Sequence, residues 1–270
     1  MQQSNLKTSI TPTALITGAS RGIGLEFANI FASQGTNLIL VARSKQDLEN
    51  LKSDILQKHN VSVNLIICDL TQKEQVLTLF NEVSNSNTRI DYLVNNAGFG
   101  DYASFAQSDW SRQESMINLN ISALTHLCHL FIREWTTKKE SGKILNVSSL
   151  ASFMPGPNMS VYFATKAFVT SFSQALNHEV KTKGITVTAL CPGPTHSHFA
   201  HAANVTFYNE LSKSIKLPTS AQVAHYGYKA MMKGKSVATH GTINQLMVFF
   251  SRFMPRNLLT KISGRVMKWG

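Results

Sequence analysis

The stretch TALITGASRGIG, residues 13–24, joins a short apolar run to a turn with three glycines, and an amphipathic stretch follows. Gly18 suits a tight turn, Gly22 lets the backbone approach a phosphate, and Gly24 permits close packing. The start of the next helix offers free N–H groups and a positive dipole end to a pyrophosphate. Glycines often serve turns without a ligand, but the order strand, turn and helix predicts a dinucleotide site.

The rest of the chain repeats this alternation of short apolar and longer amphipathic runs. The pattern predicts strands at 13–18, 37–43, 63–70, 90–98, 142–149 and 185–193. It predicts helices at 24–35, 45–60, 72–83, about 108–135 and about 158–183. Apolar strands that alternate with helices indicate parallel pairing with both faces covered, so we expect a doubly wound α/β fold. No linker or repeat interrupts the pattern, and we expect one domain over 1–270.

Bulk composition indicates a folded protein. With 270 residues, 43% of them hydrophobic and 15% charged, the chain can bury a sizeable core. The polar start, MQQSNLKTSITPT, has no apolar core of a signal peptide, and no run approaches the roughly 20 apolar residues of a membrane span. Cys68, Cys128 and Cys191 stand in apolar surroundings and are expected to be reduced core residues. We therefore expect a cytoplasmic protein without a metal.

The net charge of +11 is concentrated near the C-terminus. All 15 acidic residues precede position 211, whereas ten of the 26 Lys and Arg residues follow it. The first 210 residues are thus nearly balanced, and a partner for the basic segment must be argued separately from the function of the body. Since no nucleic-acid motif or aromatic stacking platform accompanies the charge, we expect no nucleic-acid partner.

The end of the second predicted strand bears on cofactor choice. LVARS, residues 40–44, has Ala42 where an NAD site usually carries an acid, followed by Arg43 and Ser44. A guanidinium can fork onto a 2′-phosphate, and Arg21 in the glycine turn is available to the same region. The pattern predicts NADP(H) over NAD(H), the alternative being that Arg43 is a solvated loop residue.

Polar residues also follow the third and fourth predicted strands. CDL ends with Asp69 and Leu70, and NNAG contributes Asn96, Ala97 and Gly98. These positions lie beyond the carboxyl ends of strands, where ligands bind in open α/β sheets, so we expect them to contact the cofactor. Each alone would be ordinary turn chemistry.

A tyrosine and a lysine share one face of the last long predicted helix. Tyr162 and Lys166 are four residues apart in VYFATK, and Ser149 ends the preceding strand. A nearby ammonium stabilises a phenolate and so lowers the tyrosine pKa from about 10. Tyr162 then suits a general acid towards a carbonyl or a base towards an alcohol, and Ser149 suits a hydrogen-bond donor to the same oxygen.

Together, TGASRGIG, NNAG, the spacing of Ser149, Tyr162 and Lys166, and CPGPT at 191–195 resemble the short-chain dehydrogenase/reductase family over about residues 11–240. The resemblance implies a Rossmann-type sheet of seven strands, the seventh at 236–241, and an NADPH-dependent reduction of a ketone or 3-oxoacyl-type carbonyl. It implies catalytic Asn120, Ser149, Tyr162 and Lys166, with Asn118 as the alternative to Asn120. It also implies a homodimer or homotetramer. The implied cofactor contacts are Gly18, Ser20, Arg21, Gly22, Ile23, Gly24, Arg43, Ser44, Asp69, Leu70, Asn96, Ala97, Gly98, Tyr162, Lys166, Pro192, Gly193 and Thr195.

Two segments lie outside these motifs. Residues 195–218 correspond to the family's substrate lid, whose Phe199, Phe207 and Tyr208 suit an apolar substrate. Its histidines, His196, His198 and His201, lack partnering acids or cysteines in sequence, and we interpret them as surface or lid residues rather than metal ligands.

The C-terminal extension, about 243–270, carries apolar stripes with interspersed Arg and Lys. The stripes are Leu246, Phe249, Phe250 and Phe253, and after Pro255, Leu258, Leu259, Ile262 and Val266; the cations are Arg256, Lys261, Arg265 and Lys268. Such a segment can pack on the body, on a second subunit or on an anionic membrane, and packing is favoured.

The fold leaves other functions open, since fold does not determine function. A catalytically idle NADP(H)-binding sensor or scaffold is the alternative from another class. Alcohol oxidation, dehydration and epimerisation are alternatives within the enzyme class.

Overall fold

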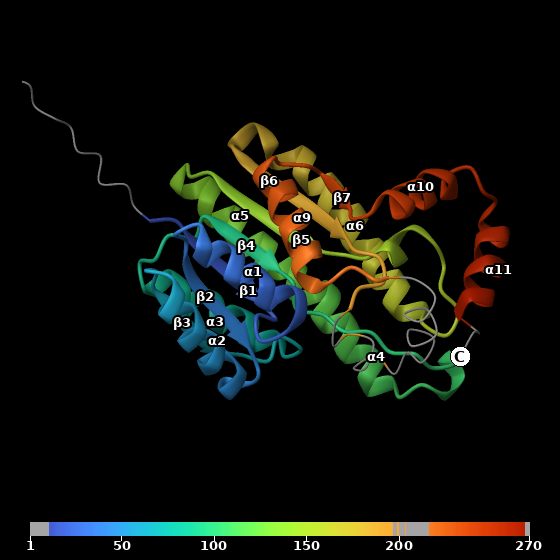
Figure 1. Ribbon diagram of the computed structural model, residues 1–270, viewed down its shortest axis with the longest axis horizontal. Coiled ribbons are helices and arrows are strands. Elements are labelled where there is room, and N and C mark those ends of the chain that lie inside the picture. The colour runs from blue at the N-terminus through green and yellow to red at the C-terminus, as the bar shows by residue number, and fades with distance from the viewer. Residues whose placement is uncertain (1–10, 197–198, 200–202, 204–215, 268–270) are drawn as a thin grey trace, which may run out of the picture.

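A computed structural model describes residues 11–196, 199, 203 and 216–267, so most of the expected lid at 195–218, including His198 and His201, lies outside the described residues. Seven parallel strands form one sheet in the order β3-β2-β1-β4-β5-β6-β7 (Figure 1). All seven predicted strands are present: β1 (Thr13–Thr17), β2 (Asn37–Ala42), β3 (Val63–Ile67), β4 (Tyr92–Asn95), β5 (Gly142–Val147), β6 (Ile185–Cys191) and β7 (Val237–Thr239). This arrangement is the doubly wound Rossmann-type fold.

Several strands end two or three residues earlier than predicted. Residues 68–70, 96–98 and 148–149 were predicted as strand but lie beyond the ends of β3, β4 and β5. At Asp69 the reason is visible, because its carboxylate accepts from the Thr71 N–H at 3.1 Å and diverts the backbone into a turn. The polar residues that follow the strands are thereby available at one edge of the sheet.

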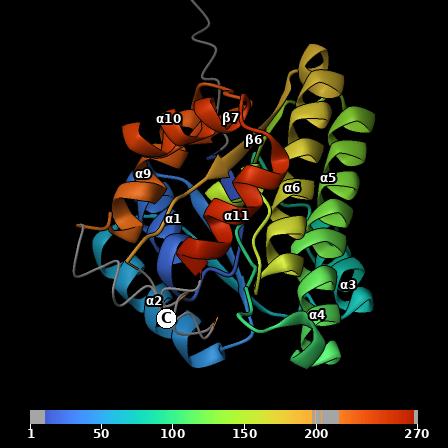
Figure 2. The ribbon, with the colours of Figure 1, turned by 90° about the vertical axis from the view of Figure 1, so that its right-hand side faces the viewer.

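Helices cover both faces of the sheet, because successive strand residues point to opposite sides. Ala14 and Ile16 pack in one core cluster and Leu15 in the other. The first cluster joins the sheet to α1 (Gly22–Ser33), α2 (Lys45–Lys58) and α9 (Ser220–Met232), and the second to α3 (Lys73–Asn85), α5 (Leu124–Lys138) and α6 (Ser160–Val180). Figure 2 shows these two layers on either side of the strands.

The helix predicted at about 108–135 is not regular. It consists of α4 (Trp110–Ile117), a π-helical segment η2 (Asn118–Ala123) and α5. Trp110–Lys138 is long and apolar enough to cross a membrane by length and composition, a property that we did not predict. However, Leu127, Phe131 and Trp135 are buried against the sheet, so this stretch is a core element of the fold.

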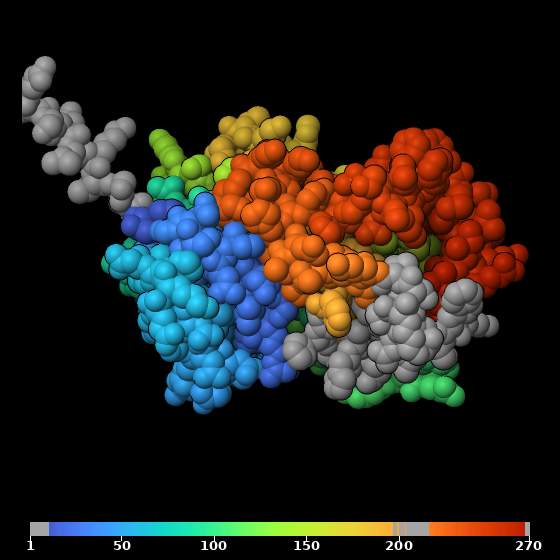
Figure 3. All heavy atoms as spheres, viewed as in Figure 1, coloured from blue at the N-terminus to red at the C-terminus, as the bar shows by residue number. Residues whose placement is uncertain are grey.

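The C-terminal extension continues past β7 as two helices, α10 (Thr242–Ser251) and α11 (Arg256–Met267). They separate at Pro255, which cannot continue a helix because it lacks an N–H donor. The Ser263 hydroxyl donates to the Pro155 carbonyl, and the Tyr102 hydroxyl donates to the Met267 carbonyl at 2.6 Å. Thus α11 is attached to the body, and the two helices occupy one end of the molecule (Figures 1 and 3).

Candidate active site

The glycine turn between β1 and α1 is built for close backbone approach. Gly18 has φ +63° and Gly22 has φ +57°, a region that side chains disfavour. A Cβ on Gly24 would lie 2.2 Å from the Gly18 carbonyl oxygen, and one on Gly18 would lie 2.9 Å from the Ala97 Cα. The turn therefore packs closely against the residues that follow β4.

Asn96 holds this turn in place. Its side-chain nitrogen donates to the carbonyls of Thr17 and Gly18, both at 3.0 Å. The Thr17 hydroxyl in turn accepts from the backbone N–H groups of Asn96 and Ala97, also at 3.0 Å. The Asn96 amide group points into the protein, where its role is to support the turn.

The residues after β2 lie at a charged rim. Arg43 is exposed, and Ser44 caps α2 by accepting from the Asp47 N–H at 3.4 Å. Asp47 also forms an ion pair with Arg21, whose guanidinium lies 2.8 Å from the carboxylate. Because β2 ends at Ala42, no acid stands at the end of this strand. The ion pair with Asp47 keeps Arg21 at the same rim.

Tyr162 and Lys166 lie on one buried face of α6. Their exposed fractions are 8% and 5%, and the Lys166 ammonium lies 5.8 Å from the centre of the Tyr162 ring. It donates to the Val147 carbonyl at 2.9 Å. Burial lowers the Lys166 pKa to about 8, against a smaller opposite effect of Cys191. With a pKa of about 8, Lys166 is mostly protonated at neutral pH and loses its proton as the pH rises above 8.

Asn120 lies inside the π-helical segment and is fully buried. Its side chain accepts from the Phe99 N–H at 3.2 Å and donates to the Phe99 carbonyl and the Thr165 hydroxyl at 2.9 and 3.1 Å. A Cβ on Gly98 would lie 2.9 Å from the Asn120 Oδ1 and 3.3 Å from the Lys166 Nζ. The structure thus places Asn120 near Lys166, whereas Asn118 begins the π-helical segment and is partly exposed.

Ser149 and the CPGPT segment complete the polar wall. Ser149 caps a short 3-10 helix by accepting from the Ala151 N–H at 3.1 Å. The next residue, Leu150, donates its N–H to the Pro192 carbonyl at 2.7 Å, which ties the ends of β5 and β6 together. Thr195 is buried and donates to the Gly193 carbonyl at 2.9 Å.

These residues surround one large cavity of about 860 Å³. Of the expected site, it is lined by Gly18, Arg21, Gly22, Ile23, Asn96, Ala97, Gly98, Ser149, Tyr162, Lys166, Pro192, Gly193 and Thr195. Seven expected residues are not part of the lining. They are Ser20 and Gly24 in and after the glycine turn, Arg43 and Ser44 after β2, Asp69 and Leu70 after β3, and Asn120 in the π-helical segment. A continuous space therefore joins the glycine turn to Tyr162.

The opposite wall of the cavity consists of residues that sequence reasoning missed as site residues. α10, α11 and the link between them contribute Ile243, Leu246, Met247, Phe250, Met254, Leu259, Ile262, Val266 and Met267. On the side of the body, Phe99, Met154, Met159 and Phe163 add apolar surface around Tyr162. The apolar stripes of the extension were the available signal, but nothing in them showed which face would meet the cleft. From the expected lid, Phe199 packs on Tyr162 with ring centres 5.3 Å apart.

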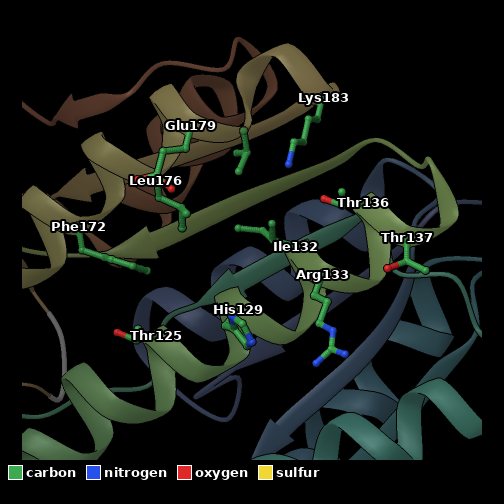
Figure 4. A pocket seen from close by; sticks show the side chains of 11 residues that line it. Thr125, His129, Ile132, Arg133, Thr136, Thr137, Phe172, Leu176, Glu179 and Lys183 are labelled. Carbon is green, nitrogen blue, oxygen red and sulfur yellow. The ribbon is translucent and has the colours of Figure 1, made fainter.

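A second cavity of about 470 Å³ lies between α5 and α6, away from these residues (Figure 4). Its lining includes Thr125, His129 and Arg133 of α5 and Phe172, Leu176 and Glu179 of α6. Within the described part of the chain, no group of three His, Cys, Asp or Glu residues is arranged to hold a metal ion. The larger cavity is the candidate active site.

Known proteins are similar to this chain in sequence and in architecture. A 3-oxoacyl-[acyl-carrier-protein] reductase of Chlamydia trachomatis is 29% identical over 208 residues, which are 77% of this chain and 84% of that protein. The human inactive hydroxysteroid dehydrogenase-like protein 1 is 29% identical over 245 residues, 90% of this chain and 72% of its own. The structure of a short-chain dehydrogenase from Sphingobium yanoikuyae in complex with NADPH has a TM-score of 0.79 and 30% identity, covering 90% of this chain and 94% of that one.

The sequence profile of the short chain dehydrogenases matches residues 12–206, which include the glycine turn, Asn120, Ser149, Tyr162 and Lys166. The matched range spans most of the sheet and the polar wall of the cavity. On this evidence, the chain belongs to the short-chain dehydrogenase family of oxidoreductases.

Proposed function

We propose that the protein reduces a ketone or 3-oxoacyl-type carbonyl to an alcohol, with NADPH as the hydride donor. The observation that carries the proposal is the single cavity that joins the glycine turn to the buried pair Tyr162 and Lys166. Family membership and the reductase named among the relatives support the same class of reaction.

The cavity fits a dinucleotide. Gly18, Gly22 and Ile23 line the cavity, and the positive φ values of Gly18 and Gly22 suit a turn that presents bare backbone to it. The first residues of α1 therefore offer their N–H groups to this space. The glycine turn would hold the pyrophosphate, Lys166 the ribose hydroxyls, and Pro192, Gly193 and Thr195 the carboxamide end. When bound, the reduced nicotinamide supplies a hydride to the carbonyl carbon.

Tyr162 then donates its phenolic proton to the carbonyl oxygen as negative charge develops there. Ser149 donates a hydrogen bond to the same oxygen. The Lys166 ammonium stabilises the phenolate left on Tyr162 because positive charge favours the deprotonated phenol. Asn120 holds Phe99 and Gly98 next to Lys166. It thereby positions Lys166 for the transfer of a proton back to Tyr162 after each turnover.

The preference for NADP(H) is part of this proposal. Arg43 is exposed at the rim, Ala42 stands at the end of β2 in place of an acid, and the acid described at this rim, Asp47, is paired with Arg21. Because charge-assisted hydrogen bonds contribute about 1.5–3 kcal/mol, Arg43→Gln should lower kcat/KM for NADPH about 10- to 100-fold and leave NADH use nearly unchanged. Arg89→Gln, which removes a guanidinium paired with Asp91 outside the cavity, is the matched control. Equal efficiency with both cofactors, unchanged in Arg43→Gln, would contradict the preference.

The reaction is tested by following NADPH absorbance with a panel of ketones, 3-oxoacyl thioesters and steroids. We expect turnover with at least one large apolar carbonyl, since the wall opposite Tyr162 is apolar. Oxidation of the corresponding alcohols with NADP⁺ measures the reverse direction in the same assay.

A catalytically idle NADP(H)-binding protein is the second candidate, and the name of the human relative favours it. The two candidates differ in turnover and not in cofactor binding. Binding of NADPH in calorimetry without turnover on any member of the panel would support the idle protein.

Assembly remains a prediction of the same kind. We expect a homodimer or homotetramer, and the groove between α5 and α6 is our candidate for its interface, with Phe168 exposed and stacked on Phe172 beside it. Light scattering after size exclusion measures the mass, and a monomer at all concentrations would contradict this expectation.

A further inference from the structure

The apolar residues of α10, α11 and the link between them fall into two groups, and only one group lines the cavity. Leu246, Phe250, Ile262 and Val266 line it. Phe249, Phe253 and Leu258 do not, yet they are 52%, 73% and 47% exposed. Phe249 and Phe253 form an aromatic pair with ring centres 5.3 Å apart. We call Phe249, Phe253 and Leu258 the outer face.

Cations are interspersed with the outer face along the sequence. Arg252, Arg256, Lys261 and Arg265 are all exposed, and among the residues that the structure describes none of the four forms an ion pair. No acidic residue occurs after position 210. Exposed aromatic side chains among unpaired cations are the composition of a segment that lies at a membrane interface. Exposed large apolar patches otherwise indicate an interaction site or a liability.

The positive charge of this segment also distinguishes two possible partners of the outer face, a second copy of the chain and an anionic membrane. In a symmetric contact with a second copy, the same patch meets itself, so four cations would face four cations without a compensating acid. Anionic headgroups satisfy the cations and accept the aromatic rings at the same depth. We propose that the outer face of α10 and α11 docks the protein on an anionic phospholipid surface.

Docking there has a consequence for the cavity. The inner side of the same two helices forms the apolar wall opposite Tyr162, so the membrane-facing surface and the cavity share one pair of helices. Both helices lie at the end of the molecule away from the β1–β3 half of the sheet (Figures 1 and 2). An apolar substrate dissolved in the bilayer then has a short route to the cavity. The docking itself is independent of the proposed reaction.

The test is flotation of the full chain with two kinds of vesicles, phosphatidylcholine alone and phosphatidylcholine with phosphatidylserine. We expect binding only to the anionic vesicles, and less binding as salt is added. Arg252→Gln with Arg256→Gln should lower the partition coefficient roughly 30-fold, since each cation near an anionic surface is worth about a fivefold change. Phe249→Ser with Phe253→Ser should lower it about tenfold or more.

Matched controls separate docking from general charge and hydrophobicity. Lys58→Gln with Lys73→Gln removes two exposed, unpaired cations from α2 and α3, and Leu56→Ser with Leu77→Ser removes two apolar side chains that are each 45% exposed. Neither control pair should change vesicle binding by more than about twofold. Thermal melting of each variant checks that it is folded.

Three outcomes would overturn the proposal. The first is no binding of the wild type to anionic vesicles. The second is equal loss of binding in the control variants. The third is a change of mass in light scattering, without a change in vesicle binding, when Phe249 and Phe253 are replaced, because that would assign the outer face to a second copy. None of these readouts depends on turnover, so the proposed function is tested separately.

Discussion

The two walls of the cavity differ in how they are held. The polar wall combines Tyr162 and Lys166 of α6 with Ser149, which follows β5, and buried hydrogen bonds such as that from Lys166 to Val147 join the two elements. The apolar wall consists of α10 and α11. Among the hydrogen bonds that attach it to the body are those from Ser263 to Pro155 and from Tyr102 to Met267. If the proposed function holds, we expect the polar wall to carry the chemistry and the apolar wall to select the substrate.

Among changes to the polar wall, loss of the Tyr162 hydroxyl should have the largest effect on turnover. Tyr162→Phe keeps the ring and its packing on Phe199 but removes the proton donor, so kcat should fall by about 10²- to 10⁴-fold. NADPH binding in calorimetry should change little. Tyr228→Phe, a partly buried tyrosine in α9 outside the cavity, is the control and should retain activity. Near-normal turnover of Tyr162→Phe on a verified substrate would refute the assignment.

A bulky side chain on the apolar wall should change selectivity and leave the chemistry intact. Ile262→Trp reduces the space opposite Tyr162, so kcat/KM for large ketones should fall roughly 10- to 100-fold while that for small ketones stays within about twofold. Leu258→Trp changes the same helix on its outer face and serves as the control. Equal losses for small and large ketones would mean that the apolar wall is not a selectivity element.

The pH dependence of carbonyl reduction should report Lys166. Burial lowers the Lys166 pKa from 10.5 to about 8, so kcat/KM should decline as the pH rises through about 8, approaching tenfold per unit. Because the folded-state pKa lies below the unfolded one, the cost of burying the ammonium disappears as the pH rises from about 8 to 10.5. This group therefore adds stability over that range, and melting curves should separate lost activity from unfolding. A flat profile to pH 10 would contradict the role of Lys166.

The smallest effect concerns the attachment of the apolar wall. Ser263→Ala removes the hydrogen bond to the Pro155 carbonyl and should lower stability by about 1 kcal/mol, a shift of a few degrees or less in Tm. Thr260→Ala, whose hydroxyl bonds only within α11 to Arg256, is the control. Limited proteolysis should cleave α11 faster in Ser263→Ala, and an unchanged cleavage rate would show that this contact is unimportant.

The polar wall could largely be predicted because its signals are local. A glycine turn after a strand and a Tyr and Lys pair on one helix face act through backbone geometry and helical periodicity, and the structure brings both to one cavity. The π-helical segment around Asn120 could not be predicted, since NLNISA is compatible with a regular helix. The role of Asn96 in supporting the turn also needed the structure, because its partners, Thr17 and Gly18, are far away in sequence.

The sequence by itself determined the order of strands and helices, the dinucleotide turn and the residues available for proton transfer, because each depends on neighbours within a few positions. Only the tertiary structure decided which side of the C-terminal helices faces Tyr162. An amphipathic helix can bury its apolar face against any apolar surface. Its sequence pattern therefore predicts which face is buried but not what covers it. The Ser263 and Tyr102 contacts attach α11 to the body, and Phe249, Phe253 and Leu258 lie outside the lining of the cavity.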